Sequence, residues 1–156
     1  MYESMFNKDL MNLQVRAKSA DQLFDFVGRD VQEKGFVNEG YIEGVKEREV
    51  NYPTGLVFPN IELALPHVDP QYICKPFIYV VRNTQPLNWK QMGDSKEMKA
   101  CYFLFLGIKE PKKQVGLLSS IIAAFKDEIF ITNFKKVVTP EEMIALLVNK
   151  FVQVTV

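Results

Sequence analysis

An uninterrupted apolar run, YFLFLGI, occupies residues 102–108 and decides the class of fold open to this chain of 156 residues. Lys99 and Lys109 bound the run. A strand that is apolar at every position is typical of a sheet covered by helices on both faces. Even extended back to Ala100, the run has about half the ~20 residues of a membrane-spanning helix, so we expect a buried strand and no membrane insertion.

Two shorter strands are predicted before this run. Residues 61–65 alternate around Glu62 and stop at Pro66, and residues 77–81 are aromatic or β-branched. A turn at Gly93 and Asp94 separates the second of these from the apolar run. The tail, residues 151–156, alternates weakly, which leaves a strand or disorder open.

Helices are predicted on either side of this block. Ser19 and Gln22 have capping-box spacing ahead of a helical apolar stripe that ends at Gly35. A second helix is expected over residues 38–48. The last third predicts helices over residues 114–125, 127–136 and from Thr139 onward, where Thr-Pro-Glu-Glu is a strong start signal.

Helices, a block of strands and then helices again predict an α/β fold. We expect a three-layer α-β-α domain with a central mixed sheet and helices on both faces. Neither a repeat nor a low-complexity tract divides the chain, so residues 1–156 are predicted to form one domain.

The composition excludes several classes of protein. The 19 basic and 19 acidic residues give a formal net charge of zero, which argues against a broad nucleic-acid binder. Apolar residues make up 47% of the chain, a proportion typical of a globular protein. The N-terminal residues lack a signal-peptide core, so we expect a cytoplasmic protein.

Most motifs for cofactors or catalysis are missing. The sequence has neither a dinucleotide-binding nor a P-loop glycine pattern, and it lacks the zinc-binding and serine-hydrolase motifs. With one histidine and two distant cysteines, it predicts no metal site and no cofactor.

The one histidine, His67, follows the short strand in the segment Ala64-Leu65-Pro66-His67. Strand ends in α/β proteins are where functional side chains emerge. A neutral imidazole is a good nucleophile and could accept a phosphoryl group. The alternative from the residues alone is a structural histidine.

An ordered set of segments resembles the enzyme IIA domains of the bacterial phosphotransferase system, of the fructose/mannitol type, which includes galactitol-type and nitrogen-regulatory members. The resemblance runs from about Leu10 to Lys150. The segments that carry it are Arg48-Glu49, Pro53-Thr54-Gly55-Leu56, Ala64-Leu65-Pro66-His67, Pro76-Phe77, Val80-Val81-Arg82, Pro86-Leu87-Asn88-Trp89, Met92-Gly93, Gln114 to Phe125 and Thr139-Pro140-Glu141-Glu142.

The resemblance implies a phosphoryl carrier. In that family the histidine, here His67, receives a phosphoryl group from the phosphocarrier HPr and passes it to a cysteine of enzyme IIB, which serves the membrane component IIC. The arginine beside it, here Arg48, would neutralise charge on the phosphoryl oxygens through guanidinium hydrogen bonds. The alternative for Arg48 is a cation that satisfies a helix end.

Three further residues are candidates for the same site. Thr54 and Gly55 lie in a turn that could offer a hydroxyl and backbone N–H groups to the phosphoryl oxygens, or be a plain turn. Gln114 stands where fructose- and mannitol-type members usually carry a second histidine, and galactitol-type members resemble this chain in having glutamine there. Val68 replaces the small residue usual after the active histidine.

Several other residues have two possible roles. Asp69 could orient the His67 ring or start a turn. Trp89 and Met92 are expected in the core or on a partner surface. The basic cluster Lys109, Lys112 and Lys113 is expected to be a solvated loop, with a partner site as the alternative.

Three functions follow from the resemblance. The first is a separate enzyme IIA of a sugar transporter, with galactitol or a related polyol as the substrate class. The second is a nitrogen-type regulator that signals by its phosphorylation state. The third is a degenerate relative that binds a partner without phosphorylation.

Overall fold

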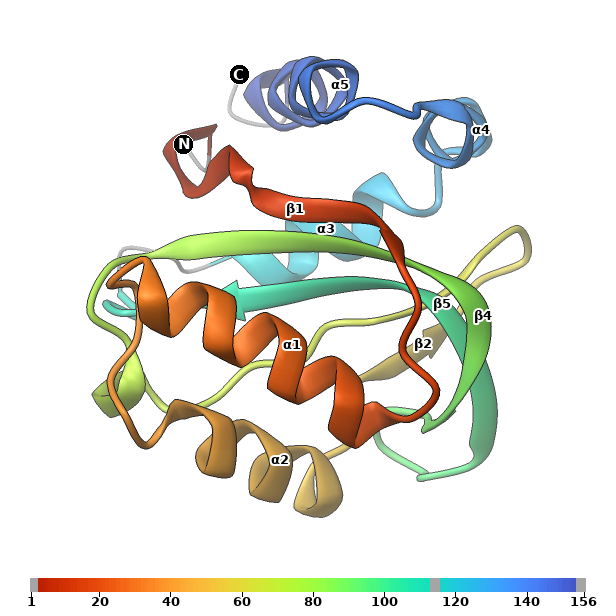
Figure 1. Cartoon of the computed structure of the whole chain (residues 1–156). Helices are drawn as coiled ribbons and strands as arrows, with labels where there is room; N and C mark the ends of the chain where they lie inside the picture. Colours follow the sequence, from red (N-terminus) through yellow and green to blue (C-terminus); the bar gives the residue numbers. More distant parts are fainter. Residues whose placement is uncertain (1–2, 113–115, 154–156) are drawn as a thin grey trace.

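The computed structural model describes residues 3–112 and 116–153, which form a three-layer α/β fold (Figure 1). The strands are β1 (Phe6–Val15), β2 (Gly55–Val57), β3 (Glu62–Ala64), β4 (Phe77–Lys90) and β5 (Glu97–Gly107). The helices are α1 (Ala20–Glu33), α2 (Tyr41–Asn51), α3 (Leu117–Ala124), α4 (Glu128–Lys136) and α5 (Pro140–Gln153), with short 3-10 helices at Glu3–Met5 and Pro70–Tyr72.

The five strands form one mixed sheet in the order β1-β4-β5-β3-β2. β4 and β5 are an antiparallel hairpin at its centre, β1 joins β4 in parallel, and β3 joins β5 in parallel. β2 closes the other edge by pairing antiparallel to β3. The mixed sheet is therefore confirmed.

Both faces of the central strands are buried, as the apolar run predicts. Leu104 and Leu106 pack into a cluster with α3, α4 and α5. Phe103 and Phe105 point to the other face and pack with residues of α1 and α2. Figure 1 shows the same division, with α1 and α2 on one side of the sheet and the three C-terminal helices on the other. The three-layer arrangement is confirmed.

Capping signals in the sequence predicted most helix boundaries to within a few residues. The Ser19 side chain accepts a hydrogen bond from the Gln22 N–H at the start of α1. Thr139 does the same for the Glu142 N–H at the start of α5. α2 begins at Tyr41 rather than at Asn38, because the Asn38 side chain accepts the Gly40 N–H in a turn that precedes the helix.

Several regions differ from the predictions. β4 continues to Lys90 instead of ending at residue 81, and Gly55, expected in a turn, begins the unpredicted strand β2. The sequence did not predict β1, which lacks a regular alternation because its register with β4 shifts twice. The start of the tail is neither strand nor disordered: α5 continues to Gln153, and the Phe151 ring packs 5.4 Å from the Phe6 ring. Residues 154–156 lie outside the described part of the chain.

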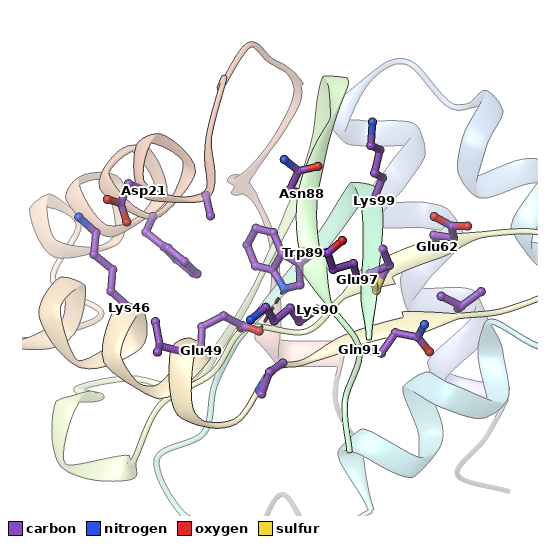
Figure 2. Close-up of a pocket in the computed structure, with 16 residues that line it drawn as sticks. Asp21, Lys46, Glu49, Glu62, Asn88, Trp89, Lys90, Gln91, Glu97 and Lys99 are labelled. Carbon is purple, nitrogen blue, oxygen red and sulfur yellow. Dashed lines mark hydrogen bonds between the residues drawn. The ribbon is translucent and has the colours of Figure 1, made fainter. Parts of the chain in front are cut away.

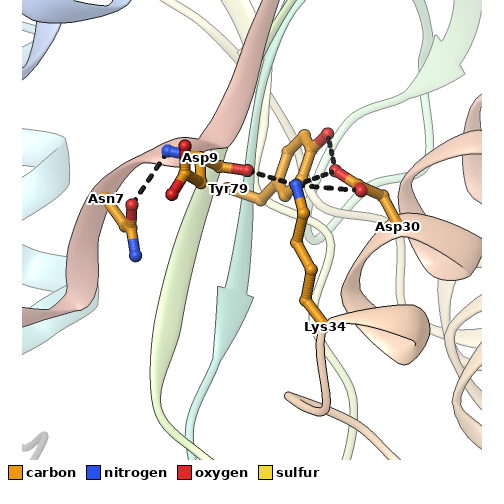
Figure 3. A network of polar contacts seen from close by, with 5 residues as sticks. All are labelled: Asn7, Asp9, Asp30, Lys34 and Tyr79. Atoms are coloured by element: carbon orange, nitrogen blue, oxygen red, sulfur yellow. Dashed lines mark hydrogen bonds and ion pairs between the residues drawn. The ribbon is translucent and has the colours of Figure 1, made fainter.

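β1 forms an edge of the sheet and is held there by polar contacts. Within its two irregular stretches, Asn7 Oδ1 accepts the Asp9 N–H at 2.8 Å and Asn12 Oδ1 accepts the Gln14 N–H at 3.0 Å. Lys34, the C-cap residue of α1, donates to the Asp9 carbonyl at 2.6 Å. Figure 3 shows Lys34 joined to Asp30, whose carboxylate also accepts the Tyr79 hydroxyl at 2.6 Å.

Candidate active site

His67 lies just past the carboxyl end of β3. The Leu106 N–H donates to the Pro66 carbonyl at 2.9 Å, and His67 forms an isolated parallel bridge with Leu106. The β3–β5 pairing is thereby extended beyond the end of β3, which gives the His67 backbone a fixed position. The side chain is partly buried, as expected for a group that emerges at a strand end.

The His67 ring is oriented by its own segment. Nδ1 lies 2.7 Å from the Leu65 carbonyl oxygen. A carbonyl oxygen can only accept, so Nδ1 carries the proton in the neutral ring. Nε2 therefore holds the lone pair, and it is the nucleophilic atom of this imidazole.

The surroundings of His67 favour the neutral ring. Burial lowers the pKa of His67 below its usual value, and the positive charge of Arg48 acts in the same direction. The hydrogen bond to Leu65 and the charge of Asp69 oppose this effect on the pKa. The net lowering leaves the imidazole neutral and able to act as a nucleophile at neutral pH.

Arg48 lies in the last turn of α2 and is held by two contacts. Its Nη1 is 3.2 Å from Asp69 Oδ1, and its Cζ lies 5.2 Å from the centroid of the Tyr52 ring. The charges of Arg48 and Asp69 both act on the pKa of His67, so the structure brings these three side chains into one neighbourhood. The sequence left Asp69 between two roles and did not predict its ion pair with Arg48.

Thr54 is buried, and both of its donors serve Glu49. The Thr54 N–H donates to Glu49 Oε2 at 2.6 Å and its hydroxyl to Oε1 at 2.8 Å. The Thr54 carbonyl accepts the Leu65 N–H at 3.2 Å, which connects the segment before β2 to the His67 segment. Thr54 therefore lies next to the site, with its donors already used inside the protein.

Gly55 is required by close packing. It begins β2 opposite Ala64, and its carbonyl accepts the Met92 N–H. A Cβ atom at this position would lie 2.3 Å from the Met98 sulfur and 2.5 Å from the Lys90 carbonyl oxygen. Packing alone accounts for a glycine here, and its role toward a phosphoryl group stays a prediction.

The structure describes only some of the remaining predicted residues. Gln114 and Lys113 lie outside the described residues. Lys112 is exposed, whereas Lys109 donates to the Cys74 carbonyl at 2.7 Å and is therefore bound to the protein. Trp89 belongs to the core: its ring lies 4.9 Å from that of Phe103.

A cavity of about 920 Å³ lies beside the site but does not contain it. Its lining includes Phe24, Glu49, Trp89 and Met98, with acidic and basic side chains together at the rim (Figure 2). His67 is not among the lining residues. The mixed charges of the rim favour neither anions nor cations, so the chemistry points to the His67 site instead.

Residues 3–112 and 116–153 contain neither a metal-binding cluster nor a membrane-spanning helix. Nowhere in these ranges do three or more His, Cys, Asp or Glu side chains gather in a way that could hold a metal ion. Among the helices of the same ranges, none is both long and apolar enough to cross a membrane.

Past the end of β3 lies a partly buried imidazole whose Nδ1 is bonded to the Leu65 carbonyl and whose pKa is lowered by burial and by the charge of Arg48. The sequence matches the family described as "Phosphoenolpyruvate-dependent sugar phosphotransferase system, EIIA 2" over residues 4–150. The chain belongs to this family, the type-2 enzyme IIA domains predicted from its motifs.

Individual relatives agree with this assignment. The galactitol-specific EIIA component of Escherichia coli K12 is 21% identical over 131 residues, which cover 84% of this chain and 86% of that protein. The nitrogen regulatory protein IIA-Ntr of Neisseria meningitidis superposes with a TM-score of 0.75 at 19% identity, covering 93% of this chain and 97% of that one.

Enzyme IIAMTL of Escherichia coli, solved in complex with phosphorylated enzyme IIBMTL, superposes with a TM-score of 0.73 at 16% identity. The match covers 92% of this chain and 97% of that chain. At these identities the two structural matches establish the fold alone.

Proposed function

We propose that this protein is a cytoplasmic phosphoryl carrier of a sugar phosphotransferase system, which accepts a phosphoryl group from phospho-HPr on Nε2 of His67 and passes it to a cysteine of enzyme IIB. The observation that carries the proposal is the hydrogen bond from Nδ1–H to the Leu65 carbonyl, which leaves the Nε2 lone pair available. Family membership supplies the phosphotransferase context.

Transfer to His67 follows from this geometry. The Nε2 lone pair attacks the phosphorus, an N–P bond forms, and the bond between phosphorus and the HPr side chain breaks with its electron pair remaining on HPr. Nδ1 keeps its proton throughout. The ring gains positive charge as the bond forms, and the Leu65 carbonyl stabilises that charge through a stronger hydrogen bond.

Arg48 would stabilise the transferring group. Phosphoryl transfer needs positioning and charge stabilisation of the equatorial oxygens more than covalent help. The guanidinium uses one N–H on Asp69 and keeps further donors for these oxygens. In the second step the cysteine sulfur attacks phosphorus, the N–P bond breaks, and its electron pair restores the neutral imidazole.

The proposed partners and substrate are inferred from the relatives of this chain. Enzyme IIAMTL was solved with phosphorylated IIBMTL, which supports an enzyme IIB partner for this chain. The galactitol-specific relative supports galactitol or a related polyol as the transported substrate. The sugar itself would be bound by the membrane component IIC.

Incubation with phosphoenolpyruvate, enzyme I and HPr tests the proposal. We expect a single acid-labile, base-stable label on wild-type protein, at Nε2 of the ring, and no label on His67→Ala. Because His67 is the only histidine, a fully labelled His67→Ala variant would refute the assignment, and a wild-type protein without label would favour the degenerate relative.

A regulatory carrier of the nitrogen type is the second candidate, because the nitrogen regulatory protein IIA-Ntr shares the fold of this chain. Both candidates predict phosphorylated His67. Transfer of the label onward to an enzyme IIB encoded beside this chain supports the transport role, and an isolated gene with no such acceptor supports the regulatory role.

A further inference from the structure

Glu49 has a partly buried carboxylate that the phosphoryl-transfer scheme does not use. Its Oε1 accepts the Thr54 hydroxyl, and its Oε2 accepts the Thr54 N–H and the Trp89 indole N–H, the latter at 3.0 Å. Three donors converge on one side chain, so both carboxylate oxygens act as acceptors. Figure 2 shows Glu49 beside Trp89 in the wall of the cavity.

The two bonds to Thr54 continue toward the imidazole through a chain of single hydrogen bonds. Glu49 holds the N–H and the hydroxyl of Thr54, the Thr54 carbonyl accepts the Leu65 N–H, and the Leu65 carbonyl accepts His67 Nδ1–H. Leu65 is thus held by Thr54 at its N–H, and its carbonyl, in the following peptide group, determines the ring tautomer.

Glu49 also adjoins Arg48 in α2, so the same three bonds anchor the end of the helix that carries the guanidinium. Burial raises the pKa of the Glu49 carboxyl, and the donors from Thr54 and Trp89 oppose this rise. Partial burial of a carboxylate costs free energy unless donors hold it, and the three donors here offset that cost only in a fixed geometry.

We infer that Glu49 is a positioning residue, which sets the orientation of the His67 imidazole through Thr54 and Leu65 and fixes the end of α2 beside it. This inference rests on the proposed role of His67. Glu49 does not touch the reacting atoms in this scheme. It acts because a displacement of about 1 Å at a reacting group costs up to about a hundredfold in rate.

The first measurement reads the imidazole itself, without any phosphorylation. In protein labelled with ¹⁵N-histidine, the single histidine gives one pair of ring signals that report which nitrogen carries the proton. Wild-type protein is expected to show protonated Nδ1. Glu49→Ala is expected to shift the ring toward the tautomer mixture of a free imidazole, and to slow transfer from phospho-HPr by about ten- to a hundredfold.

Two further substitutions separate geometry from charge and cover the case in which Glu49→Ala does not fold. Glu49→Gln keeps the reach: its carbonyl oxygen can accept the Thr54 and Trp89 N–H groups, while its NH₂ donates to the Thr54 hydroxyl. Glu49→Asp keeps the charge and shortens the reach by one methylene. Positioning predicts the wild-type tautomer for Glu49→Gln and a shifted tautomer for Glu49→Asp.

Asp30→Asn is the matched control, because Asp30 is another carboxylate that accepts several bonds, from Tyr79 and Lys34, near β1 at the far edge of the sheet. It should leave the ring signals of His67 unchanged. Unchanged signals in Glu49→Asp, or the same shift in Asp30→Asn, would overturn the inference. Absence of phosphorylation in wild-type protein would overturn the proposed function, while the ring signals would still decide the role of Glu49.

Discussion

Replacing Arg48 by alanine tests the charge stabilisation at the site. The variant removes the guanidinium whose charge acts on His67 and which pairs with Asp69 at 3.2 Å. Loss of one preorganised donor to a transition-state oxygen typically lowers the rate by about 10²–10³-fold, equivalent to about 2.7–4 kcal/mol. We therefore expect phosphoryl transfer from HPr to slow by two to three orders of magnitude.

The same substitution should change stability little. The paired side chains of Arg48 and Asp69 are 32% and 65% exposed, and an ion pair this open contributes no more than about 1 kcal/mol to the free energy of unfolding. The pKa of His67 should rise, because Arg48 is one of the groups that lowers it and Asp69 is left unopposed.

Rapid-quench measurement of ³²P transfer, with thermal unfolding in parallel, separates these effects. Arg48→Lys keeps a charge without the planar fork and should fall between wild type and Arg48→Ala. Arg82→Ala is a matched control, since Arg82 of β4 is another partly buried arginine. Its side chain donates to the Phe134 carbonyl at 2.9 Å. A folded Arg48→Ala variant with an unchanged transfer rate would show that Arg48 is only a helix-end cation.

Three further outcomes are expected. Gln114→Ala should slow transfer several-fold, because it removes one hydrogen bond worth about 1 kcal/mol. Gln114→His should add a titrating group to the pH–rate profile. An unaltered rate for the alanine variant would remove Gln114 from the site. Gly55→Ala should lower the free energy of unfolding by about 1–3 kcal/mol in urea titrations, because its Cβ would collide with Met98 and the Lys90 carbonyl, and a neutral result would contradict that packing. The pKa of His67 is lower in the folded protein than in the unfolded chain, so the unfolded state binds more protons just below pH ~6.5. Stability should therefore fall as the pH drops below that value, and a His67→Gln variant should lose this part of the pH dependence; equal dependence in both proteins would refute the direction of the shift.

The strands that could be predicted are those whose own residues form a continuous apolar run. The run at residues 102–108 and the strand beginning at Phe77 were found because helices cover both faces of β4 and β5. β4 extends past its predicted end to Lys90, through the exposed Pro86, because its register with β5 shifts between Arg82 and Leu87. Such an irregularity admits a proline, which in sequence argues for the end of a strand.

The candidate site was predictable in part. His67 at a strand end follows from the local pattern, and Arg48 from the resemblance. The ion pair of Arg48 with Asp69 joins residues 21 positions apart, on a helix and a later loop, so no periodicity reveals it. Glu49 gave one signal, its place directly after Arg48, but its bonds to Thr54 and Trp89 depend on tertiary contacts.

The two asparagines of β1 have a consequence for association between molecules. An edge strand with evenly spaced free N–H and C=O groups invites a strand from another chain to add to the sheet. Here the Asp9 and Gln14 N–H groups are already taken by side chains of the strand itself, and the Asp9 carbonyl by Lys34. Bulged in this way, β1 is a poor template for strand addition, which protects a sheet rich in aromatic and branched residues from aggregation at this edge.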